Sequence, residues 1–228
     1  MIEAEWWDYD SPDEMAQAIA GDVGFIVESA LDARGSAMLA LPADETARAI
    51  LSKLSQASFK WKHVTIVPTD DLIVGVEDER STARALAQLF LPKGARVVPI
   101  VTPLEDYRLA GNSADARLQD LPWPPDLVWL SVGGDGSAAG IAAGADLQDA
   151  LDAPKARRAV GVKPDTGEPR VTLTRASILS GRTIVIALQG QAKRDMLEQA
   201  IADGQSSKLP IGRVLAEAEQ PIDIHWCP

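Results

Sequence analysis

Cysteine and histidine are scarce in this sequence of 228 residues. The single cysteine, Cys227, excludes a disulfide within the chain and a zinc site built on several cysteines. The two histidines, His63 and His225, lie far apart, so no cluster of ligands supports a metal site. We therefore expect no metal.

Long apolar runs are also missing. No uninterrupted apolar stretch approaches the roughly 18 residues that a membrane-spanning helix needs. The first ten residues, MIEAEWWDYD, lack the basic and then apolar order of a secretory signal. The sequence predicts a cytoplasmic protein without a membrane partner.

Basic residues are in deficit. The chain has 22 lysines and arginines against 33 aspartates and glutamates, which gives a formal net charge of −11 at pH 7. A field of that sign repels phosphates, so we expect no nucleic-acid partner. A small anionic substrate remains possible, because it needs only local positive groups.

The overall composition is that of an ordinary globular protein, with 46% hydrophobic and 24% charged residues. A chain of this length buries enough surface to fold without disulfide bonds or a structural metal. We find no internal repeat and no linker, so we expect one domain over residues 1–228.

Helical and strand-like segments alternate along the chain. Apolar residues recur at helical spacing after Ser11-Pro12-Asp13-Glu14, a capping-box pattern. Further helices are expected after Asp44 or Thr46 and over 79–91, 191–202 and 210–216, while residues 102–125 are expected to be loop-like with one helical turn near 114–118. Short apolar or β-branched runs predict strands at 37–41, 63–67, 96–100, 126–131, 159–162, 171–174, 183–188 and 222–226.

This alternation predicts an α/β, Rossmann-like fold, with a mostly parallel sheet and helices on both faces. Ligands of such folds bind beyond the carboxyl ends of the strands. The turns after Leu41, Val67, Ser131 and Leu188 should therefore share one edge of the sheet.

A glycine-rich turn, Gly133-Gly134-Asp135-Gly136-Ser137, follows one predicted strand directly. Backbone N–H groups in such a turn can approach an anion closely. The alternative is a tight turn whose glycines only satisfy a positive φ. A dinucleotide fingerprint is not supported, because no acidic residue ends a second strand about 20 residues later.

Charged residues follow other predicted strands. Asp70 and Asp71 could orient a base or a sugar hydroxyl, or could simply form a solvated turn and a helix cap. Asp78-Glu79-Arg80 is expected to begin a helix. Arg170 and Lys193 could bind an anion, although each alone is more often a surface residue, and both histidines are expected to be structural.

Several segments in combination resemble the 6-phosphogluconolactonases, relatives of the glucosamine-6-phosphate deaminases. Segment 61–66 resembles the strand before that family's Asp-Glu-Arg motif, and 126–130 with Gly134-Asp135-Gly136 resembles its Gly-x-Asp-Gly-His-Thr-Ala-Ser turn. Segment 170–174 is similar to its Arg-hydrophobic-Thr-Leu-Thr strand. Gly190-x-x-Lys193, Pro210-Ile211 and segment 222–226 complete the resemblance.

The resemblance implies a hydrolase that opens 6-phospho-glucono-1,5-lactone to 6-phosphogluconate without metal or cofactor, in the pentose phosphate or Entner–Doudoroff route. It implies that an arginine and a lysine, here Arg170 and Lys193, hold the phosphate. Thr46, Gly134 and Gly136 fall at further substrate-binding positions. A histidine in the glycine turn would activate water, while hydrogen-bond donors stabilise the oxyanion.

This sequence departs from that pattern at several positions. Ser137 replaces the catalytic histidine, although Asp135 is kept, and Leu72 replaces the arginine of the Asp-Glu-Arg motif. Ala43-Asp44-Glu45-Thr46-Ala47 stands where the family has a Gly-Gly-Ser-Thr-Pro phosphate loop. Because serine is no base near pH 7 without a partner, Asp70 or Asp71 is the next candidate.

Two interpretations follow. The first is a 6-phosphogluconolactonase, weakened by the loss of its histidine, with a sugar-phosphate lactone as its ligand. The second is an inactive or repurposed member that acts as a sugar-phosphate binding or interaction protein, because a scaffold does not fix an activity. Neither interpretation indicates an oligomeric state.

Overall fold

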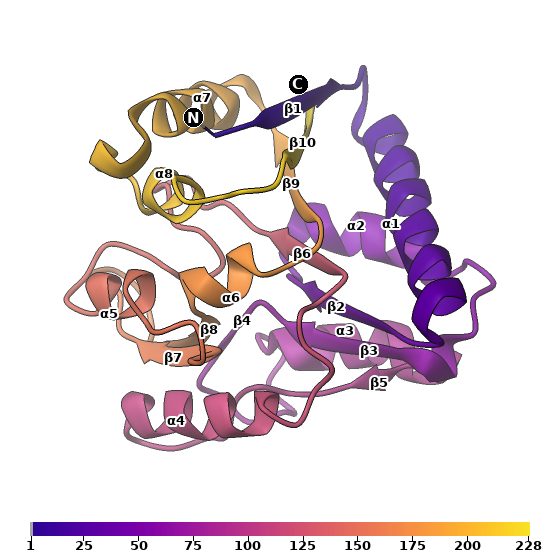
Figure 1. Ribbon diagram of the computed structural model, residues 1–228, viewed down its shortest axis with the longest axis horizontal. Coiled ribbons are helices and arrows are strands. Elements are labelled where there is room, and N and C mark those ends of the chain that lie inside the picture. The colour runs from indigo at the N-terminus through magenta and orange to yellow at the C-terminus, as the bar shows by residue number, and fades with distance from the viewer. Residues whose placement is uncertain (1) are drawn as a thin grey trace.

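A seven-stranded sheet forms the centre of the molecule in a computed structural model that describes residues 2–228 (Figure 1). Every neighbouring pair in it is parallel, as expected. The spatial order is β1 (Ala4–Asp8), β10 (Ile222–Cys227), β9 (Ile184–Gln189), β6 (Leu127–Leu130), β2 (Ala37–Leu41), β3 (Val64–Pro68) and β5 (Arg96–Val97).

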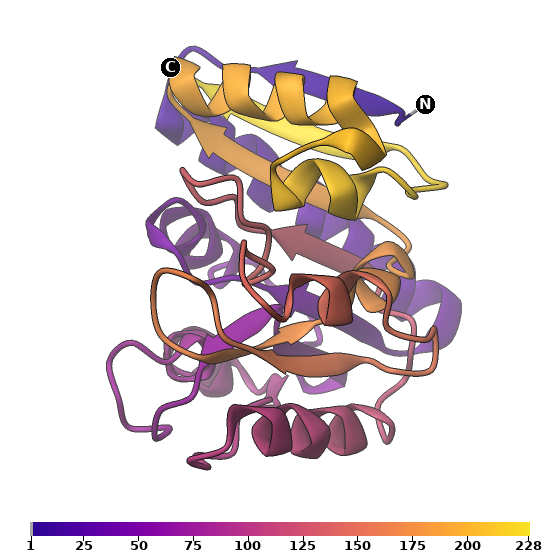
Figure 2. The same ribbon diagram turned by 90° about the vertical axis from the view of Figure 1, so that its left-hand side faces the viewer.

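Helices cover both faces of this sheet, which confirms the predicted α/β architecture (Figure 2). One face carries α1 (Pro12–Arg34), α2 (Glu45–Leu54) and α3 (Thr82–Phe90); the other carries α4 (Tyr107–Leu118), α5 (Leu147–Leu151), α6 (Arg175–Leu179), α7 (Gln191–Asp203) and α8 (Pro210–Leu215). In β2, Met38 and Ala40 join one buried cluster, while Leu39 and Leu41 join the other. Burial on both faces is the reason that these strands are apolar throughout.

A second, three-stranded sheet packs beside the first. It consists of β4 (Asp70–Leu72), β8 (Arg170–Leu173) and β7 (Ala159–Val162), joined in that order by antiparallel pairs. The strands at 159–162 and 171–174 were expected, but β4 lies where we expected a polar turn. Its three residues become a strand because they pair with β8, about 100 residues later in the chain.

Helix α4 occupies much of a region that we expected to be loop-like. Its N-cap Asp106 accepts hydrogen bonds from the N–H groups of Arg108 and Leu109. A Cβ at Gly111 would lie only 1.9 Å from the backbone nitrogen of Gly161 in β7. The helix therefore needs this glycine for close contact with the small sheet, although glycine weakens the helical signal in the sequence.

Two other local expectations were wrong. Asp78-Glu79-Arg80 precedes α3 instead of beginning it, and Ser81 is the N-cap, where its hydroxyl accepts from the N–H of Arg84. His63 ends a short 3-10 turn before β3 instead of lying in the strand. In both cases the regular element begins after the charged residues.

The register of the parallel sheet places the candidate turns together. Strands β3, β2, β6 and β9 are consecutive neighbours that run in the same direction. Their carboxyl ends therefore meet at one edge, which confirms the expectation for the turns after Leu41, Val67, Ser131 and Leu188. We call this edge the rim.

Candidate functional site

An ion pair between Asp70 and Arg170 lies at the centre of the site. Asp70 opens β4 and Arg170 opens β8, and the register puts them on one face of the antiparallel pair, diagonally opposite. Nη1 of Arg170 donates to Oδ2 of the buried Asp70 at 3.0 Å. Nε of Arg170 is buried and has no hydrogen-bond partner within residues 2–228.

The environment of Asp70 favours its protonated form. Burial raises the pKa of this carboxyl to about 6, against the opposing effect of Arg170. The charges of Asp71 and Asp44 raise it further. A carboxyl with such a pKa exchanges its proton close to neutral pH, which is what a general base needs.

The segment just after the glycine turn lies next to this pair. A Cβ at Gly140, whose φ is +83°, would lie 2.9 Å from Cδ of Arg170 and 2.9 Å from Cβ of Asp70. Gly136 also has a positive φ of +77°, so the tight-turn interpretation holds for that residue. Gly134 has a negative φ and open space around it.

Asp135 and Ser137 bond to each other within the turn. The hydroxyl of Ser137 donates to Oδ1 of Asp135 at 2.6 Å, and its N–H donates to the same atom at 3.0 Å. These hydrogen bonds hold the pKa of Asp135 below its usual value, with a contribution from the charge of Arg170. Asp135 is thus an ionised acceptor, and Ser137 is a donor in this arrangement.

Asp71 does not pair with Arg170; its carboxylate binds the N-terminus of α3 instead. Its carboxylate accepts from the hydroxyl of Ser81 at 3.0 Å and from the N–H groups of Thr82 and Ala83 at 2.7 and 2.9 Å. A negative charge at a helix N-terminus is stabilising. These contacts correspond to the helix-cap alternative for Asp71.

The turn after β2 reaches the site through its charge. Asp44 is the N-cap of α2 and accepts a hydrogen bond from the N–H of Ala47 at 2.9 Å. Of the two caps that the sequence offered, Asp44 and Thr46, the first is therefore the one used. Thr46 lies half-buried in the first turn of that helix. The negative charge of Asp44 contributes to the raised pKa of Asp70, so it acts on the site electrostatically.

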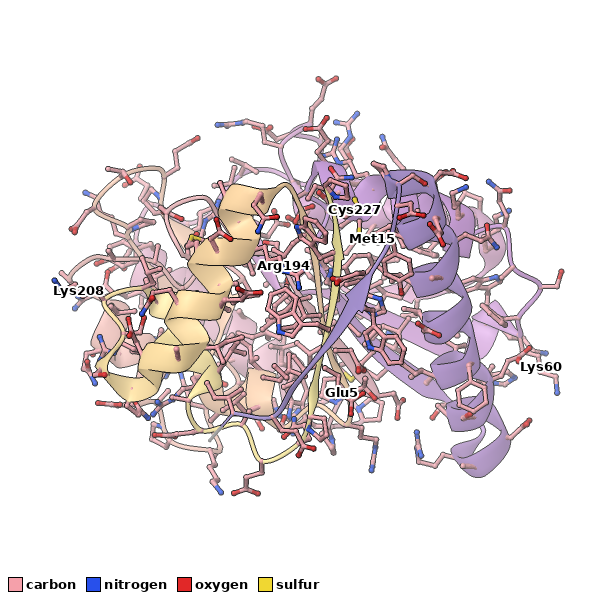
Figure 3. The ribbon with its side chains drawn as sticks, turned by 90° about the horizontal axis from the view of Figure 1, so that it is seen from above. Glu5, Met15, Lys60, Arg194, Lys208 and Cys227 are labelled. Carbon is pink, nitrogen blue, oxygen red and sulfur yellow. The ribbon has the colours of Figure 1, made fainter. Side chains whose placement is uncertain are left out.

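Lys193 lies in the first turn of α7 and is half-buried. No hydrogen bond or ion pair connects it to Asp70, Arg170 or the glycine turn in the part of the chain that the structure describes. Its neighbour Arg194, which Figure 3 labels beside α7, packs over the rings of Trp6 and Trp226 and pairs with Asp8. Unlike Arg194, Lys193 therefore has no such packing role within the described residues.

The C-terminal part contributes contacts that the sequence did not reveal. The N–H of Ile211 donates to the carbonyl of Gly136 at 2.9 Å. A Cβ at Gly136 would meet the Leu209 side chain at 2.8 Å, so this segment supports the glycine turn. The helix itself was expected over residues 210–216, but its contact with the glycine turn was not.

Within residues 2–228, no group of three or more histidine, cysteine, aspartate or glutamate side chains is arranged to hold a metal ion. No helix in the same range is both long enough and apolar enough to cross a membrane. The two histidines are apart from the site: His63 is exposed, and His225 is buried in β10.

Comparison with known proteins agrees with this geometry. The profile of the family described as glucosamine-6-phosphate isomerases/6-phosphogluconolactonase matches residues 10–226. A 6-phosphogluconolactonase of Rhizobium meliloti is 34% identical over 96% of this chain and 97% of its own, and one of Mesorhizobium japonicum is 33% identical over 98% and 95%. The crystal structure of a 6-phosphogluconolactonase from Shewanella baltica superimposes with a TM-score of 0.92 at 27% identity, over 99% of this chain and 98% of the other.

Proposed function

We infer that this chain, which belongs to the glucosamine-6-phosphate isomerase/6-phosphogluconolactonase family, hydrolyses 6-phospho-glucono-1,5-lactone to 6-phosphogluconate. The observation that carries this proposal is the similarity, over at least 96% of the chain, to relatives named 6-phosphogluconolactonase. We further propose that the protein acts in the cytoplasm and that residues 1–228 form one domain.

The site supplies the groups that lactone hydrolysis requires. Water adds to the lactone carbonyl carbon and loses a proton, and the ring C–O bond then breaks as the ring oxygen takes a proton. We assign the base to Asp70, because it is the carboxyl whose pKa of about 6 suits proton transfer near neutral pH. We assign the stabilisation of the oxyanion to Arg170, which is held beside Asp70, and to the backbone N–H groups of the glycine turn.

Ser137 limits the rate in this proposal, because a hydroxyl bonded to Asp135 cannot take a proton from water near pH 7. We expect the chain to hydrolyse the lactone at least about 100-fold more slowly than a relative with histidine at this position. We also expect Ser137→His to raise the rate by at least roughly tenfold, since imidazole titrates near neutral pH and Asp135 can orient it.

The test is a lactone-hydrolysis assay with the spontaneous rate subtracted. Ser137→Ala is the control, because it removes the hydroxyl without supplying a base. Full activity that Ser137→Ala leaves unchanged would show that the absence of histidine at this position does not limit the rate. A rate equal to the spontaneous rate in both wild type and Ser137→His would contradict the proposed hydrolase.

A second candidate function, sugar-phosphate binding without catalysis, is favoured by one observation. Arg170 is already paired with the carboxylate of Asp70, so its charge is neutralised before any ligand arrives. Under this alternative, 6-phosphogluconate would bind while the lactone is not turned over. Calorimetric titration with 6-phosphogluconate, run beside the assay, separates the two functions.

A further inference from the structure

Two arginines without a carboxylate partner face a common cavity beside the rim. Arg48, in α2, and Arg84, in α3, line a cavity of about 220 Å³ together with Glu79, Ala85 and Gln88. No salt bridge within 4.0 Å involves either arginine among the described residues 2–228. A water takes roughly 30 Å³, so the cavity has room for a phosphate group.

Other arginines near the rim or linked to its turns are already paired. Arg170 is bonded to Asp70, and Arg80 is bonded to Asp78 at 2.9 Å and Glu168 at 2.6 Å. Arg182, farther along the chain, pairs with Asp126. An arginine that keeps its carboxylate must break that pair to bind an anion, whereas Arg48 and Arg84 need not.

The cavity lies between α2 and α3, the helices that follow β2 and the β3–β4 segment at the rim. Nε of Arg48 donates to the carbonyl of Ala43 at 2.7 Å, which folds its side chain over the turn that carries Asp44. Arg84 lies in the first turn of α3, the helix whose N-terminus is held by Asp71. Asp44 and Asp71 are the carboxylates whose charges act on Asp70.

We propose that Arg48 and Arg84 bind the phosphate group of the substrate, a role that the resemblance implies for Arg170, which is here paired with Asp70. A guanidinium presents paired N–H donors that match phosphate oxygens, and two of them on one cavity form a local positive site on an otherwise acidic protein. Gln88 can add a neutral donor, while the exposed Glu79 opposes the anion. This assignment rests on the proposed function only in naming the lactone as the molecule that bears the phosphate group.

The test compares three variants with wild type. Arg48→Gln/Arg84→Gln removes both charges and keeps good helix formers in place. Lys93→Gln/Arg96→Gln is the matched control: it changes the net charge equally, at two exposed residues next to the amino end of β5. Glu79→Gln removes the opposing carboxylate. Each protein is titrated with inorganic phosphate and assayed with 6-phosphogluconolactone and with unphosphorylated glucono-1,5-lactone.

We expect the arginine variant to bind phosphate at least tenfold more weakly than wild type and to raise KM for the phosphorylated lactone by a similar factor. We expect it to leave hydrolysis of the unphosphorylated lactone unchanged. The control should behave as wild type, and Glu79→Gln should bind phosphate more tightly.

Phosphate affinity that the arginine variant leaves unchanged would overturn the assignment, as would wild-type protein that does not bind phosphate. An equal loss in the arginine variant and the control would also overturn it, because net charge alone would then account for the effect. If phosphate binding responds as expected but neither lactone is hydrolysed, the anion site stands and the proposed function fails. Circular dichroism of each variant verifies that it is folded.

Discussion

Asp70→Asn should abolish most of the lactonase activity, with a loss of about 10²–10⁴-fold in kcat. The asparagine amide keeps the size of the side chain but cannot accept a proton from water. Arg170 would also lose its only charged partner in the described chain, so the position of its guanidinium over the site would loosen. Steady-state assays at saturating lactone, with the spontaneous rate subtracted, measure this loss.

The pH dependence of the wild-type rate should show the same group. Asp70 acts as a base only when it is ionised, so kcat should rise with pH through about 6 and then level off. Asp70→Asn should lose this rise. A wild-type rate that stays constant between pH 5 and 7.5 would contradict the assignment of Asp70 as the base.

A matched control comes from another buried aspartate–arginine pair. Asp126 pairs with Arg34 and Arg182 at the amino end of β6, on the edge opposite the rim. Asp126→Asn should lower the free energy of unfolding without changing kcat, because it disturbs a buried pair far from the glycine turn. Equal losses of kcat in Asp70→Asn and Asp126→Asn would indicate damage to the fold instead of to catalysis.

Acidification should destabilise the protein through His225 by about 3 kcal/mol at pH 4. Burial lowers the pKa of this histidine to about 4, while its hydroxyl partner Tyr9 lies 2.9 Å from Nδ1. In the unfolded chain the ring takes up a proton near pH 6.5, but in the folded chain it does so only near pH 4. Protonation therefore favours unfolding, and the contribution of His225 to stability is lost as pH falls from about 6.5 towards 4.

Ionisation of Asp70 changes stability in the opposite direction over an overlapping pH range. Its raised pKa means that the folded state holds the proton more tightly, so its contribution to stability falls as pH rises from about 4 towards 6. The contribution of His225 must therefore be measured as a difference between two proteins. Urea unfolding of wild type and His225→Asn between pH 4 and 7.5 should give curves that converge towards pH 4. A constant difference across this range would show that His225 does not titrate as described.

Much of the fold could be predicted from local signals. Ser11 caps α1 through the N–H of Glu14, and Gly35 ends that helix with a φ of +73°, because capping depends on residues within one turn. The core strands could be identified because their residues are buried on both faces. Their parallel arrangement follows from the helices between them.

The centre of the site could not be predicted in the same way. Asp70 and Asp71 are adjacent in sequence, yet one pairs with Arg170 and the other caps α3. Alternation along a strand sends neighbouring side chains to opposite faces, so their roles diverge once β4 exists. That strand forms only through its pairing with β8.

The sequence by itself determined most of the order of strands and helices, the edge at which a ligand would bind, and the resemblance carried by the glycine turn and segment 170–174. Tertiary structure decided which charges meet there: it neutralised Arg170 with Asp70, raised the pKa of Asp70 by burial, and left Arg48 and Arg84 facing one cavity. The physical reason is the separation in sequence between the residues that interact. Capping and periodicity act within a few residues, whereas burial and ion pairing depend on contacts between segments far apart in the sequence, which form only when the chain folds.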